Sequence, residues 1–250
     1  MSYKIAGVCQ RGGRSYNEDC VRYSMNGTGI VCVVADGLGG HGGGEIASAV
    51  VADTLVEGFM SNPHVHNENI LHLFESANQE VLNKQVASVR MKSTVVALFL
   101  SQNAITVGHV GDSRLYRFTE GRLVFQTKDH SVSQMAVLSG EIPPEKIRFH
   151  EDRNKVLRAM GNDAAIKPEI KRLEGRPGAF EAFLLCTDGF WEYVFEDEME
   201  IDLAKSETPE DWLDSMTGRL SKRVNGKHDN FSALAVFAVD STDEITIKEW

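Results

Sequence analysis

The sequence lacks the features that mark secreted and membrane proteins. Its first residues, MSYKIAGVCQ, contain no apolar signal-peptide core. No run approaches the roughly 20 apolar residues of a membrane-spanning helix. Internal repeats, low-complexity tracts and linkers are also missing. We therefore expect one cytoplasmic domain over residues 1–250, a length that suits a single large domain.

Cysteine and positive charge are both scarce. The four cysteines stand singly, with no C-x-x-C pair, as is typical of reduced thiols in the cytosol. None is followed by arginine six residues later, which disfavours a phosphatase with a cysteine nucleophile. Lys+Arg 26 against Asp+Glu 36 gives a formal net charge of −10. This charge disfavours nucleic acid and anionic membranes as partners, and it leaves carboxylates available to hold cations.

Hydrophobic periodicity predicts a chain of strands interrupted by helices. Apolar runs predict β-strands at residues 4–10, 20–25, 30–35, 94–100, 104–110, 114–119, 122–127, 170–173, 182–187 and 231–239. Helical spacing predicts two successive helices over 46–59 and 70–82, a short helix over 132–139 and a late helix from Pro209. The short links between residues 94 and 127 indicate antiparallel neighbours. Residues 129–162 have a mixed pattern and are interpreted as an irregular flap.

The stretch VCVVADGLGGHGGGE, residues 31–45, gives the first chemical indication. An apolar run stops at Asp36, and a glycine-rich turn leads into the first predicted helix. Its glycines match the G-x-G-x-x-G pattern of dinucleotide sites, but such sites need a strand, a helix and then a parallel strand. Here a second helix follows the first. No Lys-Ser or Lys-Thr follows the glycines, as a P-loop requires. A metal site is the better interpretation.

Other carboxylates stand where predicted strands begin or end. A single acid in such a place is usually a turn former. Several together, some beside glycine, indicate one shared site. Oxygen ligands without the spacing of histidine or cysteine ligands favour Mg²⁺ or Mn²⁺ over Zn²⁺. The acids of this kind are Glu18, Asp19, Asp36, Asp112, Asp188 and Asp229.

The order and spacing of these motifs resemble those of the metal-dependent PP2C-type (PPM) serine/threonine phosphatases. The resemblance runs from about Ala6 to Val239 and is closest to compact bacterial members. It implies an α+β fold, a four-layer α-β-β-α sandwich with two central antiparallel sheets flanked by helices. The motifs are Arg14-x-x-Asn17-Glu18-Asp19, Asp36-Gly37-Leu38-Gly39-Gly40-His41 with Gly44-Glu45, Gly111-Asp112-Ser113-Arg114, Asp129-His130-Ser131, Arg153-Asn154 through Leu157-Arg158-Ala159, Thr187-Asp188-Gly189 and Asp229-Asn230.

The resemblance also implies a centre of two Mn²⁺ or Mg²⁺ ions. Asp36 would bridge both ions, and the carbonyl of Gly37 would bind one of them. Asp188 and Asp229 would hold the other ion. Two ions about 3.5–4 Å apart can share a water and lower its pKa, so that a bridging hydroxide attacks the phosphoserine or phosphothreonine ester directly. Arg14 would bind the phosphate oxygens through its planar guanidinium group.

The remaining site residues have less defined roles in this resemblance. Glu18 and Asp19 would serve the ion that the Gly37 carbonyl binds, directly or through water. Asp112 matches the position of a third, weaker ion in bacterial members, although a turn acid between two strands explains it equally well. Leu38 stands where many eukaryotic members have a histidine that protonates the leaving oxygen. That task would fall to water or, as a weaker candidate, to His41.

Two functions are consistent with these residues. The leading one is a Mg²⁺/Mn²⁺-dependent enzyme that dephosphorylates proteins phosphorylated by a cognate Ser/Thr kinase. The alternative is a catalytically weak regulatory binding module with the same fold. Relatives of the second kind usually lack a metal acid, and none is missing here. With no heptad repeat or tail in the sequence, we expect a monomer.

Overall fold

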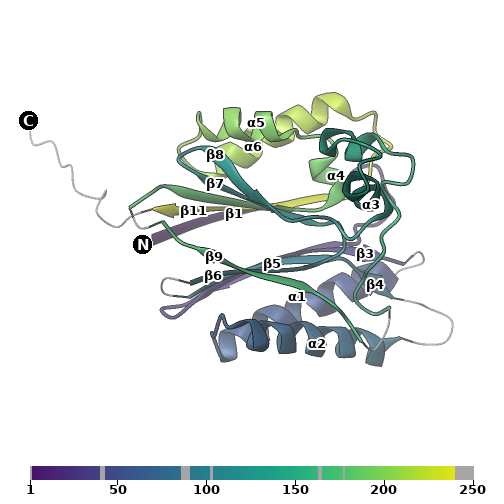
Figure 1. Ribbon diagram of the computed structural model, residues 1–250, viewed down its shortest axis with the longest axis vertical. Helices are drawn as coiled ribbons and strands as arrows, with labels where there is room; N and C mark the ends of the chain where they lie inside the picture. Colours follow the sequence, from purple (N-terminus) through teal and green to yellow (C-terminus); the bar gives the residue numbers. More distant parts are fainter. Residues whose placement is uncertain are drawn as a thin grey trace, which may run out of the picture.

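The computed structural model describes residues 2–39, 43–85, 91–101, 104–162, 165–176 and 178–239. Within them, two antiparallel β-sheets pack face to face, and helices cover the outer face of each sheet (Figure 1). The predicted α+β sandwich of four layers is confirmed. None of the described helices is both long enough and apolar enough to cross a membrane.

The first sheet brings the two ends of the described chain together. Its β1 strand pairs with β11 over nine residues, from Ser2 opposite Val239 to Gln10 opposite Phe231. The strands in spatial order are β1 (Ser2–Gln10), β11 (Phe231–Val239), β10 (Glu181–Cys186), β7 (Arg114–Thr119) and β8 (Arg122–Gln126).

The second sheet contains the hairpin that carries the glycine-rich stretch. Its strands in spatial order are β2 (Asp19–Met25), β3 (Ile30–Leu38), β5 (Val95–Ser101), β6 (Ala104–Val110) and β9 (Glu169–Glu174). The prediction that this strand ends at Asp36 is wrong, since β3 continues to Leu38. It continues because Gly37 and Leu38 pair with Ser93 and Lys92 of the short strand β4 (Lys92–Ser93).

Helices α1 (Gly43–Ser61) and α2 (Asn67–Lys84) cover the second sheet. Both run a few residues beyond their predicted bounds. On the other side, α5 (Glu196–Leu203) and α6 (Pro209–Arg223) cover the first sheet. Helix α6 begins at Pro209, as predicted, because the Thr208 hydroxyl accepts the N–H of Asp211 in a capping box.

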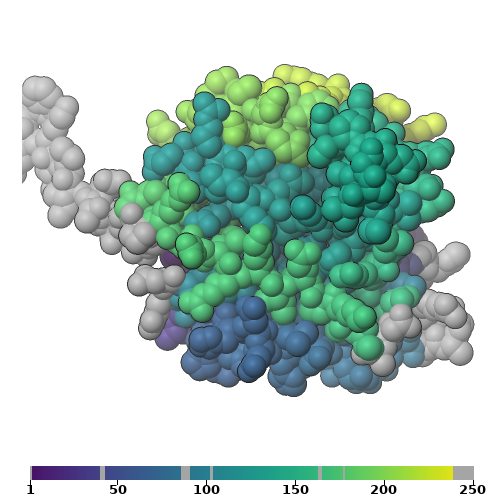
Figure 2. Space-filling view, viewed as in Figure 1, coloured from purple at the N-terminus to yellow at the C-terminus, as the bar shows by residue number. Residues whose placement is uncertain are grey.

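The flap contains two short helices, α3 (Val132–Leu138) and η1 (Pro144–Phe149). In Figure 2 this part of the chain, coloured teal, forms a lobe at the right-hand end of the sandwich. It is attached to the short helix α4 (Asp188–Trp191), because Arg148 donates to the carbonyl oxygen of Trp191 over 2.7 Å. The flap therefore stands at the same end of the molecule as the residues after β10.

Three apolar layers hold the sandwich together. Side chains such as Val34, Leu98 and Leu234 fill the space between the sheets, and all are fully buried. The outer layers lie under the helices and include Phe59 and Trp212. Each fully buried side chain of this size contributes about 1.5–3 kcal/mol. Because both faces of the central strands are covered, their sequences read as continuous apolar runs.

Candidate metal centre

Two acids face each other across the β2–β3 hairpin. Asp19 opens β2 and stands directly opposite Asp36 near the end of β3. The Thr187 hydroxyl donates to Oδ2 of Asp19 over 3.0 Å, which fixes the orientation of that carboxylate. Among the described residues, the buried Oδ1 of Asp19 has no hydrogen-bond partner. A buried carboxylate oxygen of this kind is costly unless a cation or a water molecule binds it.

Glu18 and Gly37 meet at the same place. The N–H of Gly37 donates to the carbonyl oxygen of Glu18 over 3.1 Å. A Cβ atom at Gly37 would collide with the backbone of Gly44 at the start of α1. Only glycine therefore allows the loop after β3 to approach Glu18 so closely. Burial raises the pKa of Glu18, and the negative charge of Asp229 adds to that effect.

The first sheet supplies two more acids to this end of the sandwich. Asp188 is the first residue of α4, directly after β10, and Asp229 precedes β11. The ends of these strands are joined at Thr187, whose N–H donates to the carbonyl oxygen of Ser232 over 3.0 Å. Burial raises the pKa of Asp188, and the charges of Asp112, Glu192 and Asp229 raise it further.

Asp112 lies in the turn between β6 and β7. The preceding Gly111 has a φ of +101°, and a Cβ atom there would lie 2.5 Å from Cβ of Thr94. The indole Nε1–H of Trp191 donates to the carbonyl oxygen of Asp112 over 3.0 Å. Burial raises the pKa of Asp112 to about 7, and the nearby Asp129 acts in the same direction.

These acids form one electrostatic cluster. Burial raises the pKa of Asp36 well above its usual range, and the charges of Asp19, Asp188, Asp112 and Asp229 each raise it further. Burial likewise raises the pKa of Asp19 to about 7. Asp19 and Asp112 are buried, and Glu18, Asp36, Asp188 and Asp229 are half-buried. So many neighbouring carboxylates cannot stay ionised together unless a cation joins them. Their all-oxygen donor set and the unpartnered Oδ1 of Asp19 fit hard divalent cations.

Arg14 stands at the rim of this cluster. Its Nη2 donates to Oδ2 of Asp229 over 2.5 Å, while 57% of the Arg14 side chain remains exposed. Asn230 fixes the loop that carries it, because its Nδ2 donates to the carbonyl oxygens of Arg11 and Tyr16. The Oδ1 of Asn230 accepts the N–H of Glu18 over 2.8 Å. The buried amide of Asn230 thus holds Glu18 and the loop of Arg14 close to the neighbouring Asp229.

The structure brings together all the acids that the sequence indicated, together with Gly37 and Arg14. Sequence reasoning named Thr187 only as part of a motif and missed its positioning role, and it missed Trp191 altogether. Their contacts join parts of the chain far apart in the sequence, and no local pattern indicates such contacts. Leu38 is half-buried at the end of β3. His41, the candidate proton donor, lies outside the described residues.

The sequence of this chain is similar to those of known proteins. A family model described as "Protein phosphatase 2C" matches residues 7–230. A serine/threonine phosphatase stp from Listeria welshimeri is 29% identical over 184 residues, which cover 70% of this chain and 72% of that protein. The serine/threonine protein phosphatase PstP from Mycobacterium tuberculosis is 30% identical over 191 residues, which cover 74% of this chain but 35% of that protein.

The fold is also shared with solved structures. One is the catalytic domain of a serine threonine protein phosphatase PstP in complex with two manganese ions. It is 27% identical to this chain with a TM-score of 0.80, and the match covers 95% of this chain and 99% of that domain.

Proposed function

The chain belongs to the protein phosphatase 2C family, and we propose that it hydrolyses phosphoserine and phosphothreonine esters in proteins. The observation that carries this proposal is the cluster of buried and half-buried acids, whose negative charges raise one another's pKa values. The enzyme depends on Mn²⁺ or Mg²⁺, in line with the solved PstP catalytic domain that holds two manganese ions. When bound, two such ions supply Lewis acidity, which lowers the pKa of water and neutralises charge on the phosphate.

Six residues would hold the two ions. Asp36 would be a ligand of both ions, because the charges of Asp19, Asp188, Asp112 and Asp229 all raise its pKa. Thr187 orients Asp19 for this purpose through its hydroxyl. Asp112 would hold a third, weaker ion. The proposed ligands of the first two ions are Glu18, Asp19, Asp36, the carbonyl of Gly37, Asp188 and Asp229.

Arg14 would bind the phosphate group of the substrate. It is the cation at the rim of the cluster, and its side chain is exposed to an incoming phosphoprotein. A guanidinium group presents two parallel N–H donors to a pair of phosphate oxygens, which the ammonium of lysine cannot do. Its bond to Asp229 holds the group beside the acids, so the phosphate is oriented toward them.

We also propose that the enzyme is a cytoplasmic monomer that opposes a Ser/Thr kinase. The described structure has free, fully or largely buried thiols at Cys20, Cys32 and Cys186. Such thiols are typical of proteins in a reducing compartment. Size-exclusion chromatography with light scattering would test the monomer, and a mass well above 27.7 kDa would contradict it.

Turnover with defined metals tests the proposed function. Purified protein treated with EDTA should regain activity on a phosphothreonine peptide when Mn²⁺ or Mg²⁺ is added. Metal binding measured in parallel by calorimetry separates this function from the alternative of a regulatory binding module. A protein that binds Mn²⁺ but leaves every phosphopeptide intact would be such a module, and the proposed function would be wrong.

A further inference from the structure

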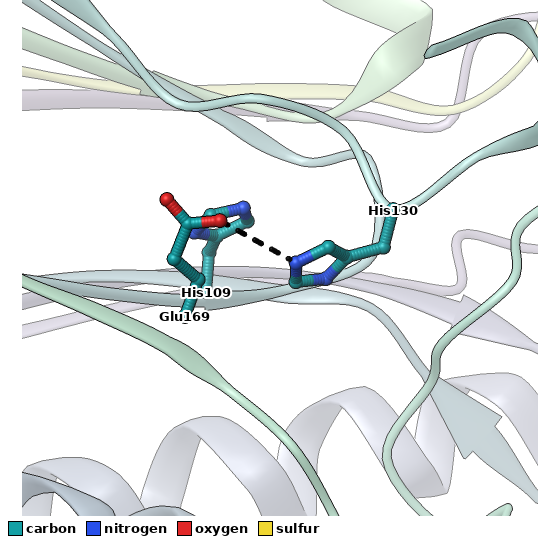
Figure 3. Close-up of side chains that lie close together, drawn as sticks. All are labelled: His109, His130 and Glu169. Carbon is teal, nitrogen blue, oxygen red and sulfur yellow. Dashed lines mark ion pairs between the residues drawn. The ribbon is translucent and has the colours of Figure 1, made fainter. Parts of the chain in front are cut away.

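A second cluster of titratable groups lies beside the acids, between the two sheets (Figure 3). It consists of His109 on β6, Glu169 directly opposite it on β9, and His130 at the start of the flap. The two imidazole rings stack at an interplanar angle of 9° with their centroids 4.6 Å apart. Nε2 of His130 lies 3.9 Å from Oε2 of Glu169. Potential ligand atoms of all three lie within 4.8 Å of one another.

The hydrogen bonds of His130 argue against a transition-metal site here. Its Nδ1 accepts the backbone N–H of Gly111 over 3.1 Å. A ring whose Nδ1 accepts a hydrogen bond carries its proton on Nε2, the atom that a metal would need. Nη1 of Arg158 lies 3.3 Å from Nε2. Because both groups then carry protons, this contact is not a hydrogen bond, and the positive charge of Arg158 disfavours a cation at Nε2. Burial lowers the pKa of His130 to about 3, and the charges of His109 and Arg158 act in the same direction. His130 is a neutral hydrogen-bonding group.

His130 holds Gly111 from both sides. Its backbone N–H donates to the carbonyl oxygen of Gly111 over 2.9 Å, and its side chain accepts the N–H of the same residue. Gly111 has a positive φ and precedes Asp112. Trp191 holds the carbonyl oxygen of Asp112, and the hydroxyls of Ser113 and Thr94 lie 2.7 Å apart on its other side. The His130 imidazole thus holds the residue that immediately precedes Asp112.

The same residue lies at the base of the flap. The carbonyl oxygen of His130 accepts the N–H of Leu157 over 2.7 Å. Its neighbour Ser131 forms an isolated antiparallel bridge with Val156. Both ends of the flap therefore meet at the residue that binds Gly111. A displacement of the flap base reaches the Asp112 turn through two hydrogen bonds.

We propose that His130 is a positioning residue: its imidazole accepts the N–H of Gly111, fixes the Gly111–Asp112 turn and so sets the affinity of Asp112 for a divalent cation, linking that site to the flap. The proposal rests on the proposed function in assigning a cation to Asp112. The stacked His109 does not contact Gly111 through any hydrogen bond of the described structure; its Nε2 bonds to the carbonyl oxygen of Lys128 instead. His109 therefore provides a matched control.

Three substitutions at His130 separate the hydrogen bond from the size of the side chain. In His130→Asn the amide oxygen can take the place of Nδ1, in His130→Gln it reaches beyond that place, and His130→Leu has no acceptor. Calorimetric titration with Mn²⁺ should show affinity at the weakest site reduced about tenfold in the Leu and Gln variants, and much less in the Asn variant. At saturating Mn²⁺, the kcat of all three should approach that of the unsubstituted protein. His109→Gln should bind Mn²⁺ as the unsubstituted protein does.

A cycle with Asp112→Asn tests whether His130 acts through Asp112. In that background, His130→Leu should cause no further loss of Mn²⁺ affinity. An equal loss in both backgrounds would overturn the proposal, as would equal affinities in the Asn and Gln variants. If His130→Leu does not fold, the difference in Mn²⁺ affinity between His130→Asn and His130→Gln still tests the proposal. Mn²⁺ binding is measured without turnover, so an unsubstituted protein that binds Mn²⁺ but lacks activity would contradict only the proposed function.

Discussion

Buried or half-buried acids occur in two neighbouring regions of this molecule, and their partners differ. Behind the metal centre, Asp129 binds Arg114 through two hydrogen bonds of 2.8 and 2.7 Å, and only 2% of either side chain is exposed. The same guanidinium group packs 3.4 Å from the ring centroid of Trp191. At the metal centre, Asp36 and Asp188 have mainly other acids around them. The first region is complete within the chain, whereas the second needs cations from solution.

This difference indicates that the first region stabilises the fold, whereas the acids of the second serve to bind cations. Removing one partner of a buried ion pair leaves the other charge uncompensated, which destabilises the fold. Removing one acid from a cluster of mutually repelling acids relieves repulsion instead, but it removes a ligand. Substitution of aspartate by asparagine should therefore lower the stability of the fold in the first region, and in the second region it should lower activity without lowering stability.

Asp36→Asn should give the largest effect on function. Without the bridging ligand, kcat on a phosphothreonine peptide should fall about a thousandfold or more at any Mn²⁺ concentration. Asp53→Asn is the matched control, because Asp53 forms an exposed ion pair with Arg22. Retained activity in Asp36→Asn would exclude the bridging role.

Asp129→Asn should give the largest effect on stability. The free energy of unfolding of the metal-free protein should fall by about 3–5 kcal/mol, since buried Arg114 loses the closer of its two anions and keeps only Glu196, 3.9 Å away. In the same urea titration, Asp36→Asn should be as stable as the unsubstituted protein or more stable. If Asp36→Asn is the less stable of the two variants, the contrast between the regions is wrong.

The metal-free protein should lose stability as the pH rises from about 4 to about 7. Burial raises the pKa of Asp19 and of Asp112 to about 7, whereas unfolded aspartates titrate near 3.9. Between these values the folded state binds more protons than the unfolded state, so the free energy of unfolding falls as pH rises. Saturating Mn²⁺ should remove this fall, because a bound cation favours the ionised acids.

Urea titrations across this pH range, with EDTA or with Mn²⁺, provide the measurement. Stability that rises with pH in EDTA would mean that these acids are ionised in the metal-free fold. The cluster would then resemble the compensated region around Asp129, and the distinction between the two would fail.

Arg14→Ala should have the smallest of these effects. Loss of the guanidinium group should raise KM for a phosphopeptide about tenfold, because two charge-assisted hydrogen bonds to phosphate are lost. Mn²⁺ affinity should change little, since Arg14 is no metal ligand. Arg14→Lys keeps the positive charge but lacks the planar guanidinium group, so its KM should lie between those of Arg14→Ala and the unsubstituted protein. Loss of Mn²⁺ binding in Arg14→Ala would contradict the assignment of Arg14 to the phosphate group.

Much of the fold could be predicted from the sequence because its signals are local. The apolar run of residues 231–239 and the capping residues before Pro209 each specify their own element. The end of β3 could not be predicted, because it depends on pairing with β4, whose two residues carry no periodic pattern. Segments this short become strands only through their neighbours.

The acids of the candidate metal centre could be selected from the sequence because each stands beside a strand end and matches a family motif; their role as ligands stays a prediction. The residues that orient them could not. In the sequence, Trp191 is indistinguishable from an ordinary core side chain. In the structure, its Nε1–H donates to the carbonyl oxygen of Asp112 over 3.0 Å. His109 had no explanation in the sequence; it faces the space between the sheets, where it stacks on His130.

The central claim is that the uncompensated acids are a site for two divalent cations that is required for dephosphorylation. Calorimetric titration of the EDTA-treated protein with Mn²⁺ tests it most directly. We expect about two tightly bound ions per chain, and loss of the bridged pair in Asp36→Asn. A protein that binds no Mn²⁺, or that binds it equally well after Asp36→Asn, would contradict the account.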